Sequence, residues 1–396
     1  MSRLDELIRD LCPDGIEFRG LGTLGRRNKG TLITAGHMKA IAQVSGPVRI
    51  FAGGATIADV SADSVPSKDI VCEPSIIVKS RGHIGFEYYE KAFTHKSELW
   101  SYTINDPAVI QKFVYYYLLT RVGELQEVAR ATSVKLPQLS IKDTDFLRIP
   151  VPPLEVQHEI VRILDKFTQL EAELEAELEA RRRQYGHYSG ALLESNQDVH
   201  QGCLGDLCTI ARGASPRPIR SFITDDAEGV PWIKIGDVPS TGKYVTGASQ
   251  RITPAGAQKS RRVKPGDFIL SNSMSFGRPY ISGIEGCVHD GWLVISDFED
   301  SFLPDYLYYL LRSAPVQAEF ERRAGSGTVK NLNADIVKSM TVPLPPRDKQ
   351  EQVVAVLDKF DVLVNDLSTG LPAELNARRK QYEYYRDKLL TFKDLA

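Results

Sequence analysis

The sequence predicts an α+β protein in which two globular α/β domains are joined by two long antiparallel helices in a coiled coil, as a tandem repeat with pseudo-two-fold symmetry. Three observations predict this fold. A repeat covers nearly all of the 396 residues. Each copy begins with short runs of valine, isoleucine and aromatic residues broken by glycine and proline, as strands and turns require. Each copy then ends in a long stretch with apolar residues at helical spacing.

The repeat is clearest where each helical stretch begins. IPVPPLEVQHEIVRILDKF at 149–167 matches VPLPPRDKQEQVVAVLDKF at 342–360, a spacing of 193 residues. Upstream, YYLL at 116–119 recurs at 308–311, and LGTL at 21–24 recurs as LGDL at 204–207. Downstream, AELEARRRQYGHYSGALL matches AELNARRKQYEYYRDKLL at a spacing of 197. We therefore divide the chain into an N-terminal segment that completes the C-terminal region (1–19), a first globular domain (20–149), a central helical region (150–201), a second globular domain (202–342) and a C-terminal helical region (343–396).

Each helical region starts at a proline pair, which a helix tolerates only in its first turn. Apolar residues then recur every three or four positions, which predicts one apolar seam on a helix of about 40 residues and about 60 Å. Gly370 and Pro372 are expected to interrupt the second helix, and Gly186 and Gly190 to fray the first. The seams of the two copies are expected to pack together through Leu164, Phe167, Leu174, Leu178, Leu357, Phe360, Leu367 and Leu375.

Composition narrows the class of protein. The net charge is -2, which excludes a uniformly basic protein, but residues 243–278 hold seven basic side chains and one acidic one. A patch of that density attracts phosphates over about 10 Å. The five cysteines do not have the spacing of a disulfide framework, and no apolar run approaches the ~20 residues of a membrane span. The first ten residues include acidic side chains, where a secretion signal would have an apolar run. These features predict a cytoplasmic protein without a membrane contact.

Matching turns of the two globular domains carry different polar side chains. In the first domain the turn follows a strand-like run at Lys79, and in the second it follows Ser271. Arginine, lysine and histidine side chains are suited to bind phosphates or the edges of guanine bases. The turns are therefore typical of two domains that recognise different DNA sequences on one scaffold. A solvated surface charge is the commoner role for any one such residue, and the argument rests on the matched turns. The residues expected to bind DNA are Arg26, Arg27, Lys29, Lys79, Ser80, Arg81, His83, Lys234, Arg251, Arg261, Arg262, Lys264, Ser271, Asn272, Ser273, Ser275 and Arg278.

No catalytic or metal-binding constellation is predicted. GLGTLG at 20–25 fits the dinucleotide pattern G-x-G-x-x-G, but RRNKG follows it where a helix is required, so a tight turn is the better interpretation. Cys203 and Cys208 lack further metal ligands and are expected to be buried free thiols. We find no phosphate-binding loop, zinc-binding helix or nucleophile elbow in the sequence.

The strings PVPPLEVQ…LDKF…EARRRQY and PLPPRDKQ…LDKF…GLPAELNARRKQYEYYRDKLLTF resemble the specificity subunit of type I restriction-modification systems. The resemblance covers essentially the whole chain. It implies that the globular domains are target recognition domains, each reading one half of a split sequence in double-stranded DNA. It also implies that the helices set the gap between the halves and dock DNA methyltransferase (modification) subunits, with restriction subunits in the full complex.

The resemblance further implies that this chain is not itself an enzyme and holds no cofactor. S-adenosylmethionine, ATP and Mg are expected on the partner subunits. Two alternatives from other classes are a stand-alone DNA-modifying enzyme and a coiled-coil scaffold whose end domains bind proteins.

Overall fold

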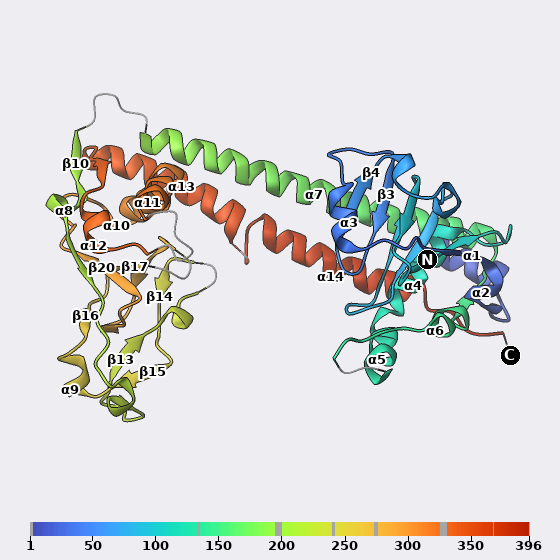
Figure 1. Ribbon diagram of the computed structural model, residues 1–396, viewed down its shortest axis with the longest axis horizontal. Coiled ribbons are helices and arrows are strands. Elements are labelled where there is room, and N and C mark those ends of the chain that lie inside the picture. The colour runs from blue at the N-terminus through green and yellow to red at the C-terminus, as the bar shows by residue number, and fades with distance from the viewer. Residues whose placement is uncertain are drawn as a thin grey trace. The chain divides into compact units, whose positions relative to one another are not determined.

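A computed structural model describes residues 3–132, 135–194, 200–239, 242–272, 276–324, 331–366 and 368–395 (Figure 1). The chain forms two compact units. Unit 1 comprises Met1–Glu173 and Asn376–Ala396, and unit 2 comprises Leu174–Leu375. Each unit combines small β-sheets with helices and a part of the long helices, so the predicted α+β class is confirmed.

Unit 1 contains a four-stranded antiparallel sheet in the order β2-β8-β5-β6 and a three-stranded sheet in the order β4-β3-β7. A short ladder, β1-β9, lies where the chain enters and leaves the globular domain. The elements are α1 (Arg3–Leu11), β1 (Phe18–Gly20), α2 (Leu21–Leu24), β2 (Gly25–Lys29), α3 (Ala35–Ala40), β3 (Val48–Phe51), β4 (Ile57–Val60), β5 (Ser75–Lys79), β6 (Gly85–Tyr89), β7 (Phe93–His95), β8 (Trp100–Ile104), α4 (Gln111–Thr120), α5 (Val122–Thr132), α6 (Ile141–Asp145), β9 (Arg148–Pro150) and the first part of α7 (Leu154–Glu194).

Unit 2 contains two five-stranded sheets, β11-β20-β17-β18-β14 and β12-β15-β13-β19-β16, and the ladder β10-β21. Its elements are β10 (Gln201–Cys203), α8 (Leu204–Leu207), β11 (Thr209–Arg212), β12 (Ile223–Thr224), β13 (Val230–Ile233), β14 (Tyr244–Val245), β15 (Gln250–Ile252), α9 (Pro254–Ala257), β16 (Arg261–Val263), β17 (Phe268–Ser271), β18 (Pro279–Ser282), β19 (Gly286–Val288), β20 (Trp292–Ser296), α10 (Pro304–Arg312), α11 (Ala314–Arg323), α12 (Ala334–Lys338), β21 (Thr341–Pro343) and α13 (Arg347–Asn365). The last helix, α14 (Leu371–Leu389), runs from unit 2 into unit 1.

The two units share one topology, as the repeat predicts. The order β2-β8-β5-β6 corresponds to β11-β20-β17-β18, and β4-β3-β7 corresponds to β15-β13-β19. Both of the latter sheets contain one parallel pair at the matching place, β3 with β7 and β13 with β19. Unit 2 adds β12, β14 and β16 at the sheet edges. The two globular domains are therefore versions of one scaffold with different edges and loops.

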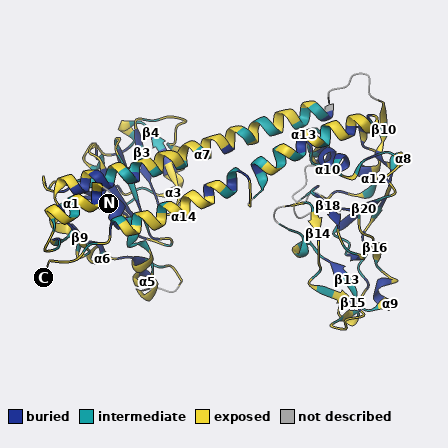
Figure 2. Cartoon of the chain, turned by 180° about the vertical axis from the view of Figure 1, so that it is seen from behind, coloured by how far each residue is buried: buried dark blue, intermediate teal, exposed yellow. Residues whose placement is uncertain are grey.

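The hydrophobic core of each unit joins its larger sheet to the helices. In unit 1, Ile160 and Leu164 of α7 are completely buried in the same cluster as Phe113 of α4 and Tyr102 of β8. In unit 2, Leu357 of α13 is completely buried in a cluster with the strands and α10. Figure 2 shows buried residues gathered in the sheets, whereas the long helices carry many exposed ones. Each globular domain is thus fixed to the start of a long helix by apolar packing.

The proline and glutamine that recur in both copies of the repeat have a structural role. Gln157 is completely buried; its side-chain oxygen accepts a hydrogen bond from Ile110 N (2.8 Å), and its amide donates to the carbonyls of Ala108 (2.8 Å) and Pro152 (2.6 Å). Gln350 repeats this pattern in unit 2 with Leu303 N (2.8 Å) and the carbonyls of Ser301 and Pro345 (2.9 Å each). Buried backbone groups need such partners, so each glutamine ties the loop before α4 or α10 to a long helix.

The aspartate of each LDKF string makes a second equivalent link. Tyr116 Oη donates to Asp165 (2.5 Å), and Tyr309 Oη donates to Asp358 (2.6 Å). These bonds make Tyr116 equivalent to Tyr309, at the same spacing of 193 residues as the proline strings. The match of YYLL at 116–119 with YYLL at 308–311 was therefore wrong by one residue. Unit 1 has three consecutive tyrosines, beginning at Tyr115, so the motif could be aligned in more than one register.

The helices pair in opposite directions within each unit. In unit 1 the Phe167 ring lies 5.7 Å from that of Tyr385, and Glu171 forms an ion pair with Arg379 (2.6 Å). Residue numbers therefore increase along α7 where they decrease along α14, so the two helices are antiparallel. In unit 2 the Phe360 ring lies 6.3 Å from that of Tyr185. Leu178 is buried there with Val364 and Leu375, and Leu174 packs against them. The predicted antiparallel pairing of the two helices is confirmed. Leu164 and Leu357 lie in the domain cores, which also include residues of the opposite helix, and Leu367 lies outside the described residues.

Two helix predictions have different outcomes. The interruption near Gly370 is confirmed, because α13 ends at Asn365 and α14 begins at Leu371. Between them Asp366 accepts hydrogen bonds from the backbone and hydroxyl groups of Ser368 and Thr369, which lower the pKa of its carboxyl to about 2. The predicted fraying of α7 was wrong: the helix runs unbroken through Gly186 and Gly190 to Glu194, 41 residues in all. The low helix propensity of glycine destabilises a helix by only about 1 kcal/mol per residue, which a long helix packed against a partner tolerates.

Residues near the two ends of the chain pair with each other in unit 1. Ile16 N donates to Lys393 O (2.9 Å), Leu395 N donates to Ile16 O (3.0 Å), and Arg148 forms an ion pair with Asp394 (2.7 Å). Gly15 has a φ of +115° and lies so close to Asp394 that a Cβ would be 2.9 Å from its carbonyl oxygen. The segment before β1 and the segment after α14 thus form one structure.

Candidate nucleic-acid interface

The turns singled out in the sequence are built in the same way in both units. The turn between β5 and β6 has Gly82 at a φ of +72°, and the turn between β17 and β18 has Gly277 at +70°. In each, a glutamine from the following helix pair holds the glycine: Gln126 donates to Gly82 O (3.1 Å) and Gln317 to Gly277 O (2.8 Å). Only glycine takes these backbone angles readily. The scaffold therefore presents a fixed turn at one place in each domain, with different side chains upon it.

The first of these turns exposes two of its predicted residues. Arg81 and His83 are exposed, and Arg81 forms a backbone bridge with Gln138. Ser80 is completely buried and donates to Glu98 O (2.7 Å). Arg81 and His83 are thus positioned for a ligand at the surface, and Ser80 is a structural residue of the turn.

Lys79 lies in the interior of unit 1. Its side chain is 9 % exposed, its Nζ forms an ion pair with Glu87 (3.1 Å), and it donates to the carbonyl of Gly54 (3.1 Å). The ammonium also lies 5.0 Å from the centre of the Phe51 ring. A lysine with these partners holds the loop after β3 to the sheet, and its charge is compensated within the domain.

The second turn is more enclosed. Ser271 is completely buried, and its hydroxyl accepts a hydrogen bond from Arg278 N (3.2 Å). Asn272 is 4 % exposed and donates to Asp290 O (2.9 Å). Arg278 is half-buried, with its guanidinium 5.0 Å from the centre of the Tyr280 ring. Ser273 and Ser275 lie outside the described residues. Ser271 and Asn272 are therefore structural residues of this turn, whereas Arg278 is partly exposed.

The basic residues predicted on β2 lie at the surface of unit 1. Arg26 pairs with Glu73 (2.6 Å) and Arg27 with Asp145 (2.7 Å), and Lys29 is exposed. Exposed ion pairs stabilise a protein by about 0–1 kcal/mol, so a phosphate can replace the carboxylate at little cost. Arg27 and Lys29 lie on one face of the edge strand β2, and Arg26 lies on the other face.

The basic residues of unit 2 divide into two kinds. Arg261, Arg262 and Lys264 are exposed on and beside β16, where Arg262 pairs with Glu285 (3.3 Å) and Arg261 donates to Arg212 O (3.2 Å). Arg251 instead donates to the carbonyls of Ala227 (3.1 Å) and Gly229 (2.7 Å), which fixes the loop before β13. Lys234 is half-buried at the end of β13.

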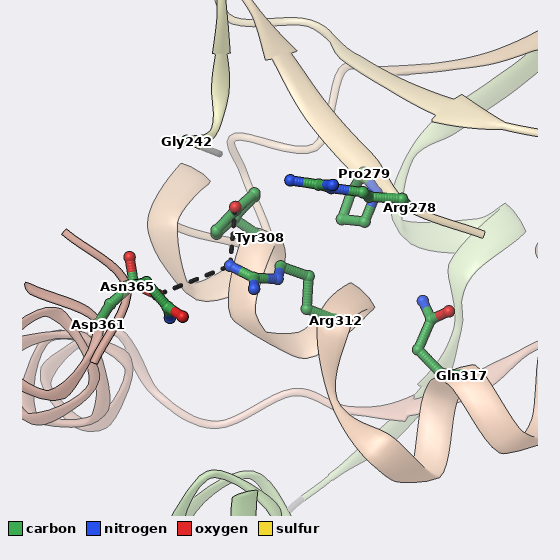
Figure 3. A pocket seen from close by; sticks show the side chains of 8 residues that line it. All are labelled: Gly242, Arg278, Pro279, Tyr308, Arg312, Gln317, Asp361 and Asn365. Atoms are coloured by element: carbon green, nitrogen blue, oxygen red, sulfur yellow. Dashed lines mark hydrogen bonds and ion pairs between the residues drawn. The ribbon is translucent and has the colours of Figure 1, made fainter. Parts of the chain in front are cut away.

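Sequence reasoning missed Arg312, the last residue of α10. It borders a pocket of about 410 Å³ together with Arg278, Tyr308 and Asp361 (Figure 3). Its Nη1 donates to Tyr308 Oη (2.9 Å) and lies 3.7 Å from Asp361 Oδ1. A comparison of the two copies would have found it, because the equivalent position in unit 1 is Leu119.

The residues set aside as non-functional behave largely as expected. Leu21 and Leu24 of the GLGTLG segment are buried in the four-residue helix α2, which fits a packed turn. Cys208 is buried, which raises the pKa of its thiol to about 12, but Cys203 is exposed, so the expectation that both are buried was wrong. Across the part of the chain that the structure describes, no group of three or more histidine, cysteine or acidic side chains is placed to hold a metal ion. No helix within the described ranges is long and apolar enough to cross a membrane.

Comparison with known protein families gives one assignment. The family model of the type I restriction modification DNA specificity domain matches residues 50–180 and again 196–377, which together are more than half of the chain. The chain belongs to the type I restriction-modification DNA specificity family. The two matches coincide with the two copies of the module, so the family's domain is present twice.

Relatives in the family extend over most of the chain. A type I restriction enzyme specificity subunit of Escherichia coli is 30% identical over 304 residues, which cover 73% of this chain and 72% of that protein. A putative type I restriction enzyme specificity subunit of Haemophilus influenzae is 32% identical over 295 residues, covering 71% and 72%. The similarity to specificity subunits therefore extends over more than two thirds of the chain.

Solved structures agree on the fold. A chain from a study of complex assembly and conformational transition of the type I restriction-modification system has a TM-score of 0.65 at 14% identity, covering 96% of this chain and 98% of that one. The S subunit of a type I restriction-modification system from M. genitalium has a TM-score of 0.51 at 18% identity, covering 96% and 97%. The fold of the family is retained although few residues are identical.

Proposed function

We propose that this chain is the subunit that selects the DNA target of a type I restriction-modification complex, with each unit reading one half of a bipartite site in double-stranded DNA. One observation carries this proposal: the two units hold the same glycine turn with the same glutamine bond, yet present Arg81 and His83 in one and Arg278 in the other. A duplicated scaffold with unlike side chains at one matched place is suited to two different half-sites.

Phosphate contacts and base contacts have different candidates. Arg26, Arg27 and Lys29 in unit 1 and Arg261, Arg262 and Lys264 in unit 2 are exposed or paired only at the surface, and we assign them to the DNA backbone. Arg81 and His83, on a turn fixed by hydrogen bonds, are assigned to base edges in the first half-site. Helical phase favours half-site centres about one turn of duplex, ~10 bp, apart.

The long helices are assigned two tasks, setting the gap between half-sites and docking DNA methyltransferase subunits, with restriction subunits in the full complex. The unbroken 41 residues of α7 and its paired seam support a rigid spacer. Methyl transfer and cleavage are assigned to the partners, which would carry S-adenosylmethionine, ATP and Mg, and the complex would act on DNA in the cytoplasm.

Selection of bound duplexes from a random-sequence pool tests the assignment. The full chain, alone and with its methyltransferase partner, is expected to enrich two blocks of defined bases at a constant spacing. Arg81→Ala should relax the preference in one block and leave the other intact. Arg130→Ala is the matched control, because Arg130 is an exposed arginine of the same unit that pairs locally with Glu127.

Three outcomes contradict the proposal in different ways. Enrichment of a single block of bases would contradict recognition of a bipartite site. Relaxed preference in both blocks on Arg81→Ala would contradict the assignment of Arg81 to one half-site. Methyl transfer or cleavage by the pure chain with S-adenosylmethionine and Mg would favour a stand-alone enzyme. Complete lack of salt-dependent DNA affinity, even with the methyltransferase partner, would favour a protein-binding scaffold.

A further inference from the structure

The chain leaves the first strand of each larger sheet through a loop that starts in the same way in both units. In unit 1 this loop is GTLIT at 30–34, directly after β2, and in unit 2 it is GASPRPIRS at 213–221, directly after β11. The residue after the glycine donates to the last residue of a strand of the smaller sheet, Thr31 N to His95 O (2.8 Å) and Ala214 N to Val288 O (3.2 Å). Because β2 and β11 are edge strands, we call the two segments the edge loops.

In unit 2 the edge loop lies beside the turn between β17 and β18. Asp290, in the connection between β19 and β20, accepts a hydrogen bond from Ser215 Oγ at its Oδ1 (2.7 Å), and its backbone N donates to the same hydroxyl (3.3 Å). The carbonyl of Asp290 accepts a hydrogen bond from Asn272 Nδ2 of the turn (2.9 Å). One residue therefore fastens both the edge loop and the turn.

Unit 1 has the same arrangement. Thr31 of the edge loop forms a backbone bridge with Lys96, in the connection between β7 and β8. Lys96 forms an ion pair with Glu98 (2.7 Å), and the carbonyl of Glu98 accepts a hydrogen bond from Ser80 Oγ (2.7 Å), directly before Arg81. In both units, therefore, one connection joins the edge loop to the turn that we assign to base recognition.

Arg217 of the second edge loop is oriented by its surroundings and remains exposed. The residues on either side are Pro216 and Pro218, whose rings fix their backbone φ angles. The Nη2 atom of Arg217 lies 3.5 Å from Asp290 Oδ2, and the side chain is 82 % exposed. A guanidinium has five N–H donors in a planar fork. Within the described ranges Asp290 is the one ion-pair partner of Arg217, so most of these donors are available to a ligand.

The two edge loops carry side chains of opposite character. The second contains Arg217 and Arg220, whereas the first has no charged residue and exposes 91 % of Leu32. The phosphate backbone is the same in both halves of a DNA site, so loops that bound phosphates would be expected to carry a cation in both copies. Base edges differ between half-sites. The unlike side chains of the edge loops therefore favour base recognition over phosphate binding.

We propose that the edge loops are a second base-recognition element of each domain, an inference that rests on the proposed function. Arg217 binds the O6 and N7 acceptors of a guanine in the second half-site, as a guanidinium fork can. Leu32 contacts the methyl group of a thymine in the first half-site, since this methyl group is the apolar feature of the major groove. Each edge loop thus extends the surface of the neighbouring turn to a further base pair.

Selection of duplexes by the full chain with its methyltransferase partner tests the proposal. Arg217→Lys keeps the charge and removes the fork, so it should lower the preference for guanine at one position of one block about tenfold. The salt slope of binding should stay unchanged. Leu32→Ala should lower the preference for thymine at one position of the other block about fourfold.

Each of these variants is a control for the other, because the two act on different half-sites. Arg322→Lys is the matched control for Arg217, since Arg322 is an exposed arginine of the same unit that pairs locally with Glu319 (2.6 Å). It should leave the selected bases and the affinity unchanged.

Substituted bases provide a readout that loss of folding does not imitate. 7-Deazaguanine lacks the N7 acceptor, and uracil lacks the methyl group of thymine. At the positions found by selection, 7-deazaguanine should weaken binding of the wild type about tenfold and uracil about fourfold. The first substitution should not weaken binding of Arg217→Ala further, and the second should not weaken binding of Leu32→Ala further.

Two results would overturn the proposal. If Arg217→Ala weakens binding to every sequence and lowers the salt slope by about one without changing the selected bases, Arg217 binds a phosphate. If either Arg217→Ala or Leu32→Ala retains the base selection and affinity of the wild type, its edge loop lies outside the DNA interface. A wild type that selects no bipartite site is a separate failure, that of the proposed function itself.

Discussion

Replacing the buried glutamine at the start of either long helix should destabilise one unit and spare the other. Gln157→Ala removes the partners of Ile110 N and of the Ala108 and Pro152 carbonyls, all at a side chain that is completely buried. Each orphaned buried group costs about 1–3 kcal/mol. Because water can enter the space left by the side chain and satisfy some of these groups, we expect a total loss of about 4 kcal/mol.

The loss should be visible as a shift of one thermal transition. For a unit of about 200 residues, 1 kcal/mol corresponds to about 2–4 °C, so the unfolding midpoint of unit 1 should fall by about 8–16 °C. Gln350→Ala should produce the same fall in unit 2, since Gln350 makes the same three kinds of bond. Hydrogen exchange resolved by peptides around residues 105–120 and 298–312 assigns each change to its unit.

Gln169→Ala is the control for this prediction. Gln169 lies on the same helix as Gln157, but it is exposed, and its amide donates a hydrogen bond to Glu173 one turn further along the helix (2.8 Å). The expected change is below about 0.5 kcal/mol. If Gln157→Ala and Gln350→Ala both lose less than about 1 kcal/mol, or if each weakens both units equally, the glutamines do not fasten the domains to the helices.

Three further predictions follow from single side chains. His95 is completely buried, which lowers its pKa to about 4, so folding favours its neutral form. The free energy of unfolding of unit 1 should be at its full value above pH 6.5 and fall by up to about 3 kcal/mol toward pH 4. His95→Gln should remove this pH dependence from the unfolding curves of unit 1. Lys79→Met should destabilise unit 1 by about 1–3 kcal/mol and leave the salt slope of DNA binding unchanged, whereas a flattened slope would show that Lys79 meets phosphate. Arg261→Ala should weaken binding to every duplex sequence and reduce the salt slope by about one; an effect limited to one sequence would contradict its assignment to the backbone.

The repeat made most of the architecture predictable, because identical residues in two copies expose what the shared scaffold requires. Gln157 and Gln350 could be matched from the sequence, and so could Asp165 and Asp358. Their partners could not, since these are backbone groups and tyrosines nearly 50 residues away. The continuity of α7 through Gly186 also escaped prediction, because packing against the second helix outweighs local propensity.

The candidate site was less predictable for a physical reason. Charged residues are assigned to the surface by default, and Lys79 breaks that rule because Glu87 and two carbonyls compensate its ammonium inside the domain. Arg312 was overlooked because a search for shared residues discards positions where the copies differ. In a duplicated reader, those differing positions are where the two specificities must reside.

The pairing of Ile16 with Lys393 and Leu395 has a consequence for biosynthesis. Unit 2 is one continuous stretch, Leu174–Leu375, and is free to fold as soon as the ribosome has released it. Unit 1 is interrupted by that stretch and must wait for Asn376 onward. At 5–20 residues per second the delay is roughly 10–40 s. During this time the first half of the molecule exposes the apolar flank that α14 later covers, so nascent chains are most vulnerable to proteases and most dependent on chaperones there.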